Sequence, residues 1–344
     1  MMGALDRIPW WMMSISDHLS RICEDIYQLI LPLPFALNHV NVYLLRGDEG
    51  WTVLDCGLHT AEAAAIWSEA KQALGIQAKD LSQIILTHAH PDHYGMAGMM
   101  QKEAEAEGRE LPVYLSVEEA AFAELMWKRA PHAKLMYRHL LQCGMPEETV
   151  REVSDTEHFT RKGTFPQANF AGFLMPGSQK RIGNRNCEVI AAPGHSEGQV
   201  IFYDEEDQLL FCGDHVLIKI TPNIGFWPKS RPDPLGRYLA SLKTLSAVKV
   251  SRALPGHRAI IQDWRGRLAE LSAHHDARLA KTLLACEPPA TAYEVAAQLF
   301  DPTRFTPHEW RFAMVEALAH LECLRVRGRL RRRGETVWQY ERVN

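Results

Sequence analysis

The sequence lacks any long apolar run. No segment reaches the roughly 18 uncharged apolar residues that a membrane-spanning helix needs. The first twenty residues also lack the cationic start and apolar block of a secretory signal peptide. The formal net charge of -4 is small and creates no general attraction to nucleic acid or to membranes. These absences predict a cytoplasmic protein with no membrane partner.

Cysteine is scarce, and several common catalytic patterns are missing. The seven cysteines are widely scattered and form no Cys-x-x-Cys pair, which argues against a disulfide framework and against a thiolate zinc site. The sequence also contains no P-loop, no dinucleotide-binding glycine fingerprint and no Ser-His-Asp pattern. What remains is a chain of 344 residues, 46% of them hydrophobic, which is enough for a large core and more than one domain.

The most informative segment is the run of residues 87–93, which contains three histidines and an aspartate. It follows a predicted strand over 81–87 and precedes a predicted helix over 94–107. Because residues two apart in an extended segment point the same way, His88 and His90 can bind one ion. Asp92 and His93 then turn toward a second position. The alternative interpretation is a polar loop exposed to solvent.

This His-x-His-x-Asp-His pattern after an apolar strand resembles the signature of the metallo-β-lactamase superfamily. Three further candidates follow in the family's order, each after a short apolar segment and a glycine: His195, Asp214 and His257. Asp55, at the end of a predicted strand, matches an acidic residue that supports a ligand or a loop, with a structural salt bridge as the alternative. The resemblance covers about residues 25–260.

The resemblance implies a site for two divalent metal ions. It assigns three ligands to each ion and one ligand to both, which are His88, His90 and His195, then Asp92, His93 and His257, and finally Asp214. Imidazole and carboxylate ligands favour Zn²⁺, although Fe or Mn would accept the same set. A water shared by two cations loses its proton near neutral pH and becomes the attacking hydroxide. Asp92 is the expected catalytic residue, because it can orient this group and carry a proton.

Apolar and helical segments alternate along the first part of the chain. We expect strands over 26–33, 40–46, 51–55, 81–87 and 113–116, and helices over 61–74, 94–107 and 118–128. This order predicts an α+β fold, an αββα sandwich, which is also the fold that the resemblance implies. We expect the catalytic domain to span residues 1–260. An insertion over about 130–183 is predicted to be partly helical and to overhang the site, either as a lid or as a surface decoration.

The chain changes character after residue 260. A helix is predicted over 262–285, followed by two capping boxes that begin at Thr291 and Thr306 and by a hairpin with Gly334 at its turn. This arrangement over 261–344 resembles a winged-helix domain, which some members of the superfamily carry. Such a module can supply the interface of a homodimer. Six arginines within residues 325–333 could contact phosphates, but docking onto the rest of the protein is the favoured interpretation.

These observations predict a binuclear metal-dependent hydrolase that attacks an ester- or thioester-type carbonyl of a small-molecule substrate. Relatives in the superfamily also cleave lactones, β-lactams and phosphodiesters. One alternative is a small metal-dependent nuclease that uses the arginine-rich hairpin, with nucleic acid as its partner. The other is a mononuclear-iron persulfide dioxygenase, which the presence of both Asp92 and His257 disfavours.

Overall fold

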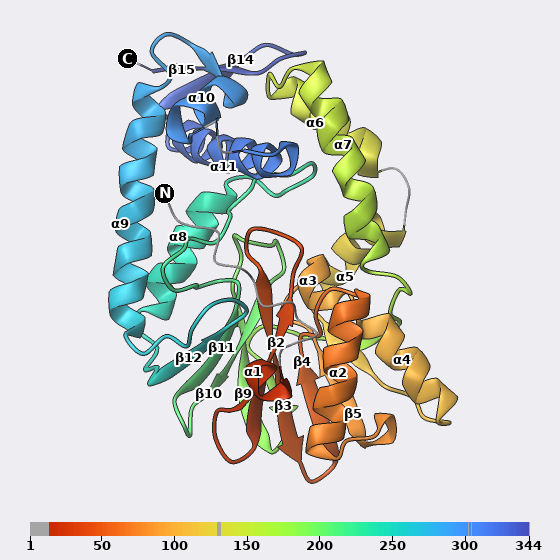
Figure 1. Cartoon of the computed structure of the whole chain (residues 1–344). Coiled ribbons are helices and arrows are strands. Elements are labelled where there is room, and N and C mark those ends of the chain that lie inside the picture. Colours follow the sequence, from red (N-terminus) through yellow and green to blue (C-terminus); the bar gives the residue numbers. More distant parts are fainter. Residues whose placement is uncertain (1–13, 129–131, 302, 304, 344) are drawn as a thin grey trace.

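The computed structural model describes residues 14–128, 132–301, 303 and 305–343, so the first thirteen residues of the predicted catalytic domain lie outside it. Two β-sheets pack face to face, and helices cover their outer surfaces (Figure 1). The first sheet has seven strands in sequence order, β1 (Leu19–Arg21), β2 (Ile26–Pro32), β3 (His39–Gly47), β4 (Gly50–Leu54), β5 (Leu81–Ile85), β6 (Val113–Leu115) and β7 (Phe170–Phe173). The second has five, in the order β12 (Arg252–Pro255), β11 (Leu209–Gly213), β10 (Val200–Asp204), β9 (Arg185–Ala191) and β8 (Gln179–Ile182). The predicted αββα sandwich is confirmed.

Strand β3 of the first sheet is buried on both faces, which explains its nearly continuous apolar sequence. On β3, Val42 and Leu44 point outward and pack in the cluster that includes the helix side chains of α2 (Ala61–Leu74). Tyr43 and Leu45 point inward and pack between the two sheets. This alternation follows from the two-residue period of a strand and fixes which face meets the second sheet.

The remaining helices on the side of the first sheet are short. They are α1 (Ile15–His18), the 3₁₀ turn η2 (Ala78–Asp80), α3 (Pro91–Tyr94), α4 (Ala97–Ala106), α5 (Val117–Ala123) and the π-helical turn η3 (Glu124–Lys128). The helix predicted over 94–107 is confirmed as α4, which begins three residues later than predicted, and α3 is a separate short helix before it. Between them, Gly95 lies against another segment, where a Cβ would approach the carbonyl oxygen of Gly163 to 2.4 Å.

The predicted insertion over 130–183 differs from the structure in its extent. Only its first part is helical, as α6 (His132–Gln142) and α7 (Glu147–Lys162). Its last part supplies β7 to one sheet and β8 to the other. These strands have only four residues each and lie among prolines and glycines, so the local pattern carries little strand signal. The lid role of the helical part stays a prediction.

Beyond the second sheet lie α8 (Pro234–Leu245) and α9 (Trp264–Leu284), and α9 leads to the C-terminal elements (Figure 1). These are β13 (Ala290–Thr291), α10 (Ala292–Leu299), α11 (Pro307–Val326), β14 (Leu330–Arg333) and β15 (Gln339–Arg342), with a small sheet in the order β13-β15-β14. Both predicted capping boxes are confirmed, at Thr291 and at Thr306. Side chains from α6–α9, α11 and the second sheet form one continuous apolar cluster. The boundary at residue 260 and the winged-helix assignment stay predictions.

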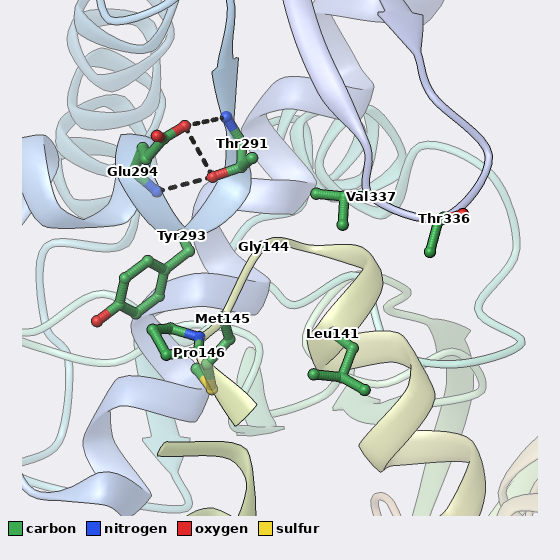
Figure 2. Close-up of a pocket in the computed structure, with 9 residues that line it drawn as sticks. All are labelled: Leu141, Gly144, Met145, Pro146, Thr291, Tyr293, Glu294, Thr336 and Val337. Carbon is green, nitrogen blue, oxygen red and sulfur yellow. Dashed lines mark hydrogen bonds between the residues drawn. The ribbon is translucent and has the colours of Figure 1, made fainter. Parts of the chain in front are cut away.

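The turn between α6 and α7 docks against the C-terminal elements. The Trp338 N–H donates to the Gln142 carbonyl at 2.7 Å, and the Tyr293 N–H donates to the Cys143 carbonyl at 3.0 Å. Gly144 fits beside the Thr291 side chain, where a Cβ would approach to 2.6 Å (Figure 2). A pocket of about 520 Å³ lies beside this contact. Helices α6 and α7 thus connect the sandwich to the C-terminal region on the side opposite α9 (Figure 1). Among the described helices, none has the length and apolar character to cross a bilayer.

Candidate metal centre

The loops that carry the predicted ligands meet at one edge of the sandwich. Because β11 and β12 are parallel, Asp214 and His257, which follow them, come to the same end of the second sheet. Glycines precede both ligands and have a steric reason to be there. A Cβ on Gly256 would approach an Asp214 carboxylate oxygen to 2.3 Å, and Gly213 has a positive φ of 48°. The glycine before a ligand candidate is thus required by close packing at the site.

All seven predicted ligands lie in this cluster. They form three groups whose candidate ligand atoms lie within 4.8 Å of one another, namely His88, His90 and His195; His88, His93 and Asp214; and Asp92, His93 and His257.

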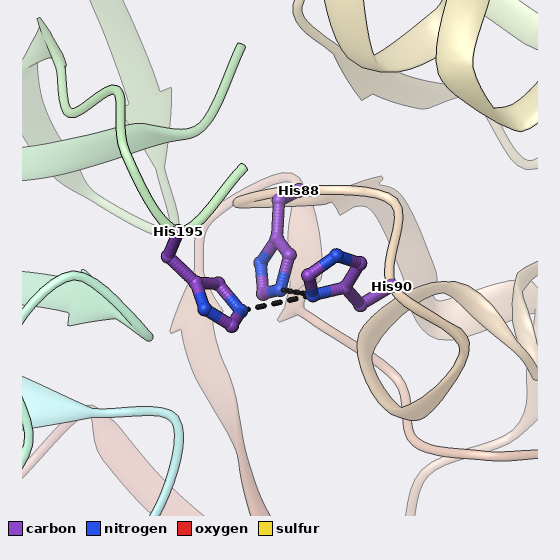
Figure 3. Close-up of side chains that lie close together, drawn as sticks. All are labelled: His88, His90 and His195. Atoms are coloured by element: carbon purple, nitrogen blue, oxygen red, sulfur yellow. Dashed lines mark hydrogen bonds between the residues drawn. The ribbon is translucent and has the colours of Figure 1, made fainter. Parts of the chain in front are cut away.

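The first group brings together three ring nitrogens, one from each histidine (Figure 3). His88 Nε2 lies 3.1 Å from His90 Nδ1, which lies 2.9 Å from His195 Nε2. Two imidazoles bound to one tetrahedral zinc ion at roughly 2.0–2.1 Å would place their nitrogens roughly 3.3 Å apart. The spacing therefore suits a small cation bound by all three rings.

The other two groups combine histidines with a carboxylate. His257 Nε2 lies 3.3 Å from an Asp92 oxygen and 3.1 Å from Asp214 Oδ2. His93 Nε2 lies 3.4 Å from Asp214 Oδ1, and Asp214 Oδ2 also lies 3.5 Å from His195 Nε2. Asp214 thus lies between the two groups of histidines, where a single carboxylate could contact two ions.

Four imidazoles are oriented by a hydrogen bond at Nδ1, the ring nitrogen that points away from the centre of the cluster. His88 Nδ1 lies 2.9 Å from the Thr87 hydroxyl, His93 Nδ1 2.8 Å from Asp55, His195 Nδ1 2.9 Å from the Asn223 carbonyl, and His257 Nδ1 2.6 Å from the His39 carbonyl. Where Nδ1–H donates to such an acceptor, Nε2 keeps its lone pair. This is the tautomer that a metal ion requires.

Asp55 connects two of these rings. Its Oδ2 accepts from the Thr87 hydroxyl at 2.8 Å and from His93 Nδ1 at 2.8 Å, and its Oδ1 accepts from the Thr87 N–H at 2.8 Å. Since the Thr87 hydroxyl donates to Asp55, its oxygen is available to accept from His88 Nδ1. One buried carboxylate therefore orients His93 directly and His88 through Thr87.

The buried polar atoms at the centre of the cluster fit a cation. His93 Nε2, His257 Nε2 and Asp214 Oδ1 are buried and have no hydrogen-bond partner among the described residues. Burial alone would lower the pKa of His257, but the carboxylates of Asp214 and Asp92 raise it to about 9. Leaving a buried polar group without a partner costs about 1–3 kcal/mol, and more where it is charged. A divalent cation would give these atoms a partner and replace the proton of His257.

Comparisons with known proteins agree with this geometry. Residues 36–257 match the family model of the metallo-beta-lactamase superfamily. Residues 279–343 match a second family model, which is described as "Metallo-beta-lactamase-like, C-terminal domain". The chain belongs to the metallo-beta-lactamase superfamily.

Individual relatives of the superfamily match most of the chain. A metallo-beta-lactamase family protein of known structure from Thermus thermophilus is 35% identical with a TM-score of 0.83, covering 94% of this chain and 100% of that one. The Bacillus subtilis (strain 168) protein "Probable metallo-hydrolase YqjP" is 28% identical over 312 residues, covering 88% of this chain and 92% of that protein. An Aspergillus terreus (strain NIH 2624 / FGSC A1156) protein named "Atrochrysone carboxyl ACP thioesterase" is 24% identical over 280 residues, covering 78% and 68%.

Glu119 on α5 is a site residue that the sequence did not reveal. Its buried carboxylate accepts from the Ala89 N–H at 2.8 Å and from the Gly198 N–H at 2.8 Å, and the Ser196 hydroxyl also donates to it. It therefore joins the loop of His88 and His90 to the loop of His195. In sequence, Ser116 and Glu119 have the spacing of a capping box. In the structure, Ser116 caps the helix while the Glu119 side chain turns to the ligand loops.

The arginine-rich hairpin is a second polar cluster, and its geometry is different. Arg333 pairs with Glu341 at 2.7 Å, and Arg331 pairs with the same carboxylate. Arg325 and Arg332 pair with Glu322 at 2.8 and 3.2 Å. Four of the six arginines thus have a carboxylate partner within the C-terminal region itself, with two arginines sharing each carboxylate.

Proposed function

We propose that this chain is a binuclear metal-dependent hydrolase that cleaves an ester or thioester. The proposed ligands are the seven residues of the cluster, with His88, His90 and His195 at one ion, Asp92, His93 and His257 at the other, and Asp214 shared. Zn²⁺ is the proposed ion because a set of five imidazoles and two carboxylates suits it. The observation that carries the proposal is the convergence of candidate ligand atoms from seven side chains, of which His93 Nε2, His257 Nε2 and Asp214 Oδ1 are buried and have no hydrogen-bond partner among the described residues.

The chain's own residues divide the work. When bound, the ions would activate a water and polarise the substrate carbonyl. Asp92 is partly exposed, with its Oδ2 3.3 Å from His257 Nε2, so it can orient a nucleophile and move a proton to the leaving group. His90, Asp92 and His195 are the partly exposed members, whereas His88, His93, Asp214 and His257 are buried. Substrate therefore approaches from the side of His90, Asp92 and His195.

The nature of the bond cleaved is supported by relatives. Two proteins similar to this chain are named ACP thioesterases, which makes a thioester the first substrate class to test. The paired arginines of the C-terminal hairpin lend no support to a nuclease.

Metal analysis and a substrate panel test the proposal together. Protein purified without chelators is expected to contain two zinc ions per chain by elemental analysis. It is expected to hydrolyse an acyl thioester or ester in preference to a lactone or a phosphodiester. One iron ion per chain with sulfur-oxidising activity would support the dioxygenase instead, and selective phosphodiester cleavage would support the nuclease. Either result would contradict the proposal.

A further inference from the structure

One of the four oriented histidines is held differently from the others. The Nδ1 atoms of His88, His93 and His257 are hydrogen-bonded to oxygens of Thr87, Asp55 and His39, respectively. These three partners lie in or next to the strands of the first sheet. His195 instead bonds to the main-chain carbonyl of Asn223, at 2.9 Å. Asn223 lies in the long segment 214–233 between β11 and α8, which contains no helix or strand. A carbonyl in such a segment needs an anchor of its own to orient an imidazole.

The anchor comes from α11, in the C-terminal region. The Asn223 side-chain amide donates to Glu316 Oε2 at 3.0 Å and to the Phe312 carbonyl at 3.3 Å. Three residues later, the Phe226 N–H donates to the Val315 carbonyl at 3.0 Å. Gly225 packs against the same helix, where a Cβ would approach Val315 Cγ2 to 3.0 Å. The segment that holds His195 is therefore fastened to α11 at several successive points.

Glu316 is a buried carboxyl among apolar residues of α11. Its side chain is 8% exposed, on a helix that otherwise contributes Met314, Val315, Ala317 and Leu318 to the apolar cluster. Burial raises the pKa of Glu316 to about 7. An apolar residue at this point would cost the fold less than a buried carboxyl does. The contact that this carboxyl makes toward the metal centre is with Asn223.

We infer that Glu316 is a positioning residue, which orients the His195 imidazole through Asn223, given the ligand role proposed for His195. The C-terminal region is thereby part of the support of the metal centre, and not only a module attached to it. The path runs from the Glu316 carboxyl to the Asn223 amide, and from the Asn223 carbonyl to His195 Nδ1. Neither Glu316 nor Asn223 touches the reacting atoms.

The inference is tested by metal binding rather than by turnover. The affinity for Zn²⁺ is measured by competition with a chromogenic chelator, and the ligand field by the absorption spectrum of the Co²⁺-substituted protein. Residues that orient metal ligands typically change metal affinity by about 10–100-fold, so Glu316→Ala is expected to weaken Zn²⁺ binding about tenfold and to change the Co²⁺ spectrum. Glu316→Gln keeps an oxygen that accepts from Asn223, and is expected to remain within about twofold of the wild type.

Asn223→Ala gives an independent approach to the same contact. It removes the donor, and it should weaken Zn²⁺ binding by about the same factor as Glu316→Ala. The double variant should be no weaker than either single variant, because both changes break one path. Purely structural effects at two separate places would add instead. If Glu316→Ala fails to fold, the same measurements are made on Asn223→Ala, because Asn223 lies in the irregular segment.

Glu322→Ala is the matched control. Glu322 is equally a buried carboxylate of α11, at 1% exposure, but it accepts from Tyr340 at 2.6 Å and pairs with Arg332, on the side of β14 and β15. Its removal is expected to lower the melting temperature and leave Zn²⁺ affinity unchanged. If Glu316→Ala and Asn223→Ala keep the wild-type Zn²⁺ affinity and Co²⁺ spectrum while His195→Ala impairs binding, the inference is overturned and the proposed function stands. Zinc binding that is indifferent to His195→Ala would overturn the proposed function as well.

Discussion

The metal-centre loop and the arginine-rich hairpin are both dense clusters of polar residues, but they differ in the burial and in the pairing of their side chains. At the metal centre the side chains are buried or partly exposed, four of the imidazoles are oriented at Nδ1 by the protein, and the candidate ligand atoms converge. In the hairpin, Arg331 and Arg333 are more than half exposed, and their guanidinium groups pair with Glu341. Density of one residue type in the sequence therefore does not identify a site.

What distinguishes the two clusters is whether the protein satisfies its own polar groups. Four imidazoles are each held at Nδ1, which leaves Nε2 directed at a common point. Holding such atoms together in a buried place costs free energy unless a ligand joins them. The hairpin carries no such cost, because Arg331 and Arg333 are more than half exposed to solvent and share the Glu341 carboxylate. Substitutions in each cluster test this difference, and the largest effect is expected at the metal centre.

Asp214→Ala should have the largest effect, because it removes the carboxylate that lies between both groups of histidines. Metal content measured by elemental analysis should fall from two ions per chain to one or none, and kcat/KM should drop at least about a thousandfold. Asp204→Ala is a matched control, because Asp204 is equally buried but pairs with Arg185 away from the site. That control should lose stability and keep its metal. Full metal content in Asp214→Ala would remove the central premise of the comparison.

Asp55→Ala should have the next largest effect. Its carboxylate accepts three hydrogen bonds and orients His93 directly and His88 through Thr87. Zinc affinity, measured by chelator competition, should fall about 10–100-fold. Asp55→Asn should not restore it, because an amide nitrogen would face donors where an acceptor is needed. Wild-type affinity in both variants would mean that Asp55 only stabilises the fold.

The metal-centre loop could be predicted from sequence because its information is local. His88, His90 and His93 lie within six residues, next to an apolar strand. The later ligands could be found because each follows a strand and a glycine.

The supporting residues could not be predicted, because their partners are distant in the chain. Glu119 lies 79 residues from Gly198, and Asn223 lies 93 residues from Glu316. Ser116 and Glu119 resemble a helix start, and Glu316 lies on one ordinary helix, so neither pattern indicates the contact. The strands β7 and β8 were missed for a related reason, since four-residue strands are stabilised by their neighbours in the sheet and not by their own pattern.

Glu316 is intermediate between the two clusters, because its buried carboxyl accepts from the Asn223 amide and the charge of Arg278 opposes the effect of burial on its pKa. Because burial raises its pKa to about 7, the folded protein binds a proton that the unfolded chain releases at lower pH. The resulting stability is present below the unfolded pKa and is lost as pH rises through about 7. Glu316→Gln does not ionise, so its melting temperature relative to the wild type should increase by a few degrees between pH 5 and pH 7.5, followed by circular dichroism. A constant difference across this range would show that Glu316 keeps an ordinary pKa.

Arg331→Ala combined with Arg333→Ala should have the smallest effect. Exposed ion pairs contribute about 0–1 kcal/mol, so the free energy of unfolding should change by less than about 2 kcal/mol, and kcat/KM should stay within about twofold. Binding of single-stranded RNA at low salt should be weak in the wild type and remain weak in the double variant.

Glu341→Gln sharpens the comparison, because it frees both guanidinium groups without removing them. If pairing is what keeps the hairpin inert, this variant should bind RNA more tightly than the wild type, in a salt-dependent way. Strong RNA binding by the wild type that the double variant loses would instead make the hairpin a binding site, and the pairing of its arginines with Glu341 would no longer distinguish it from the metal centre.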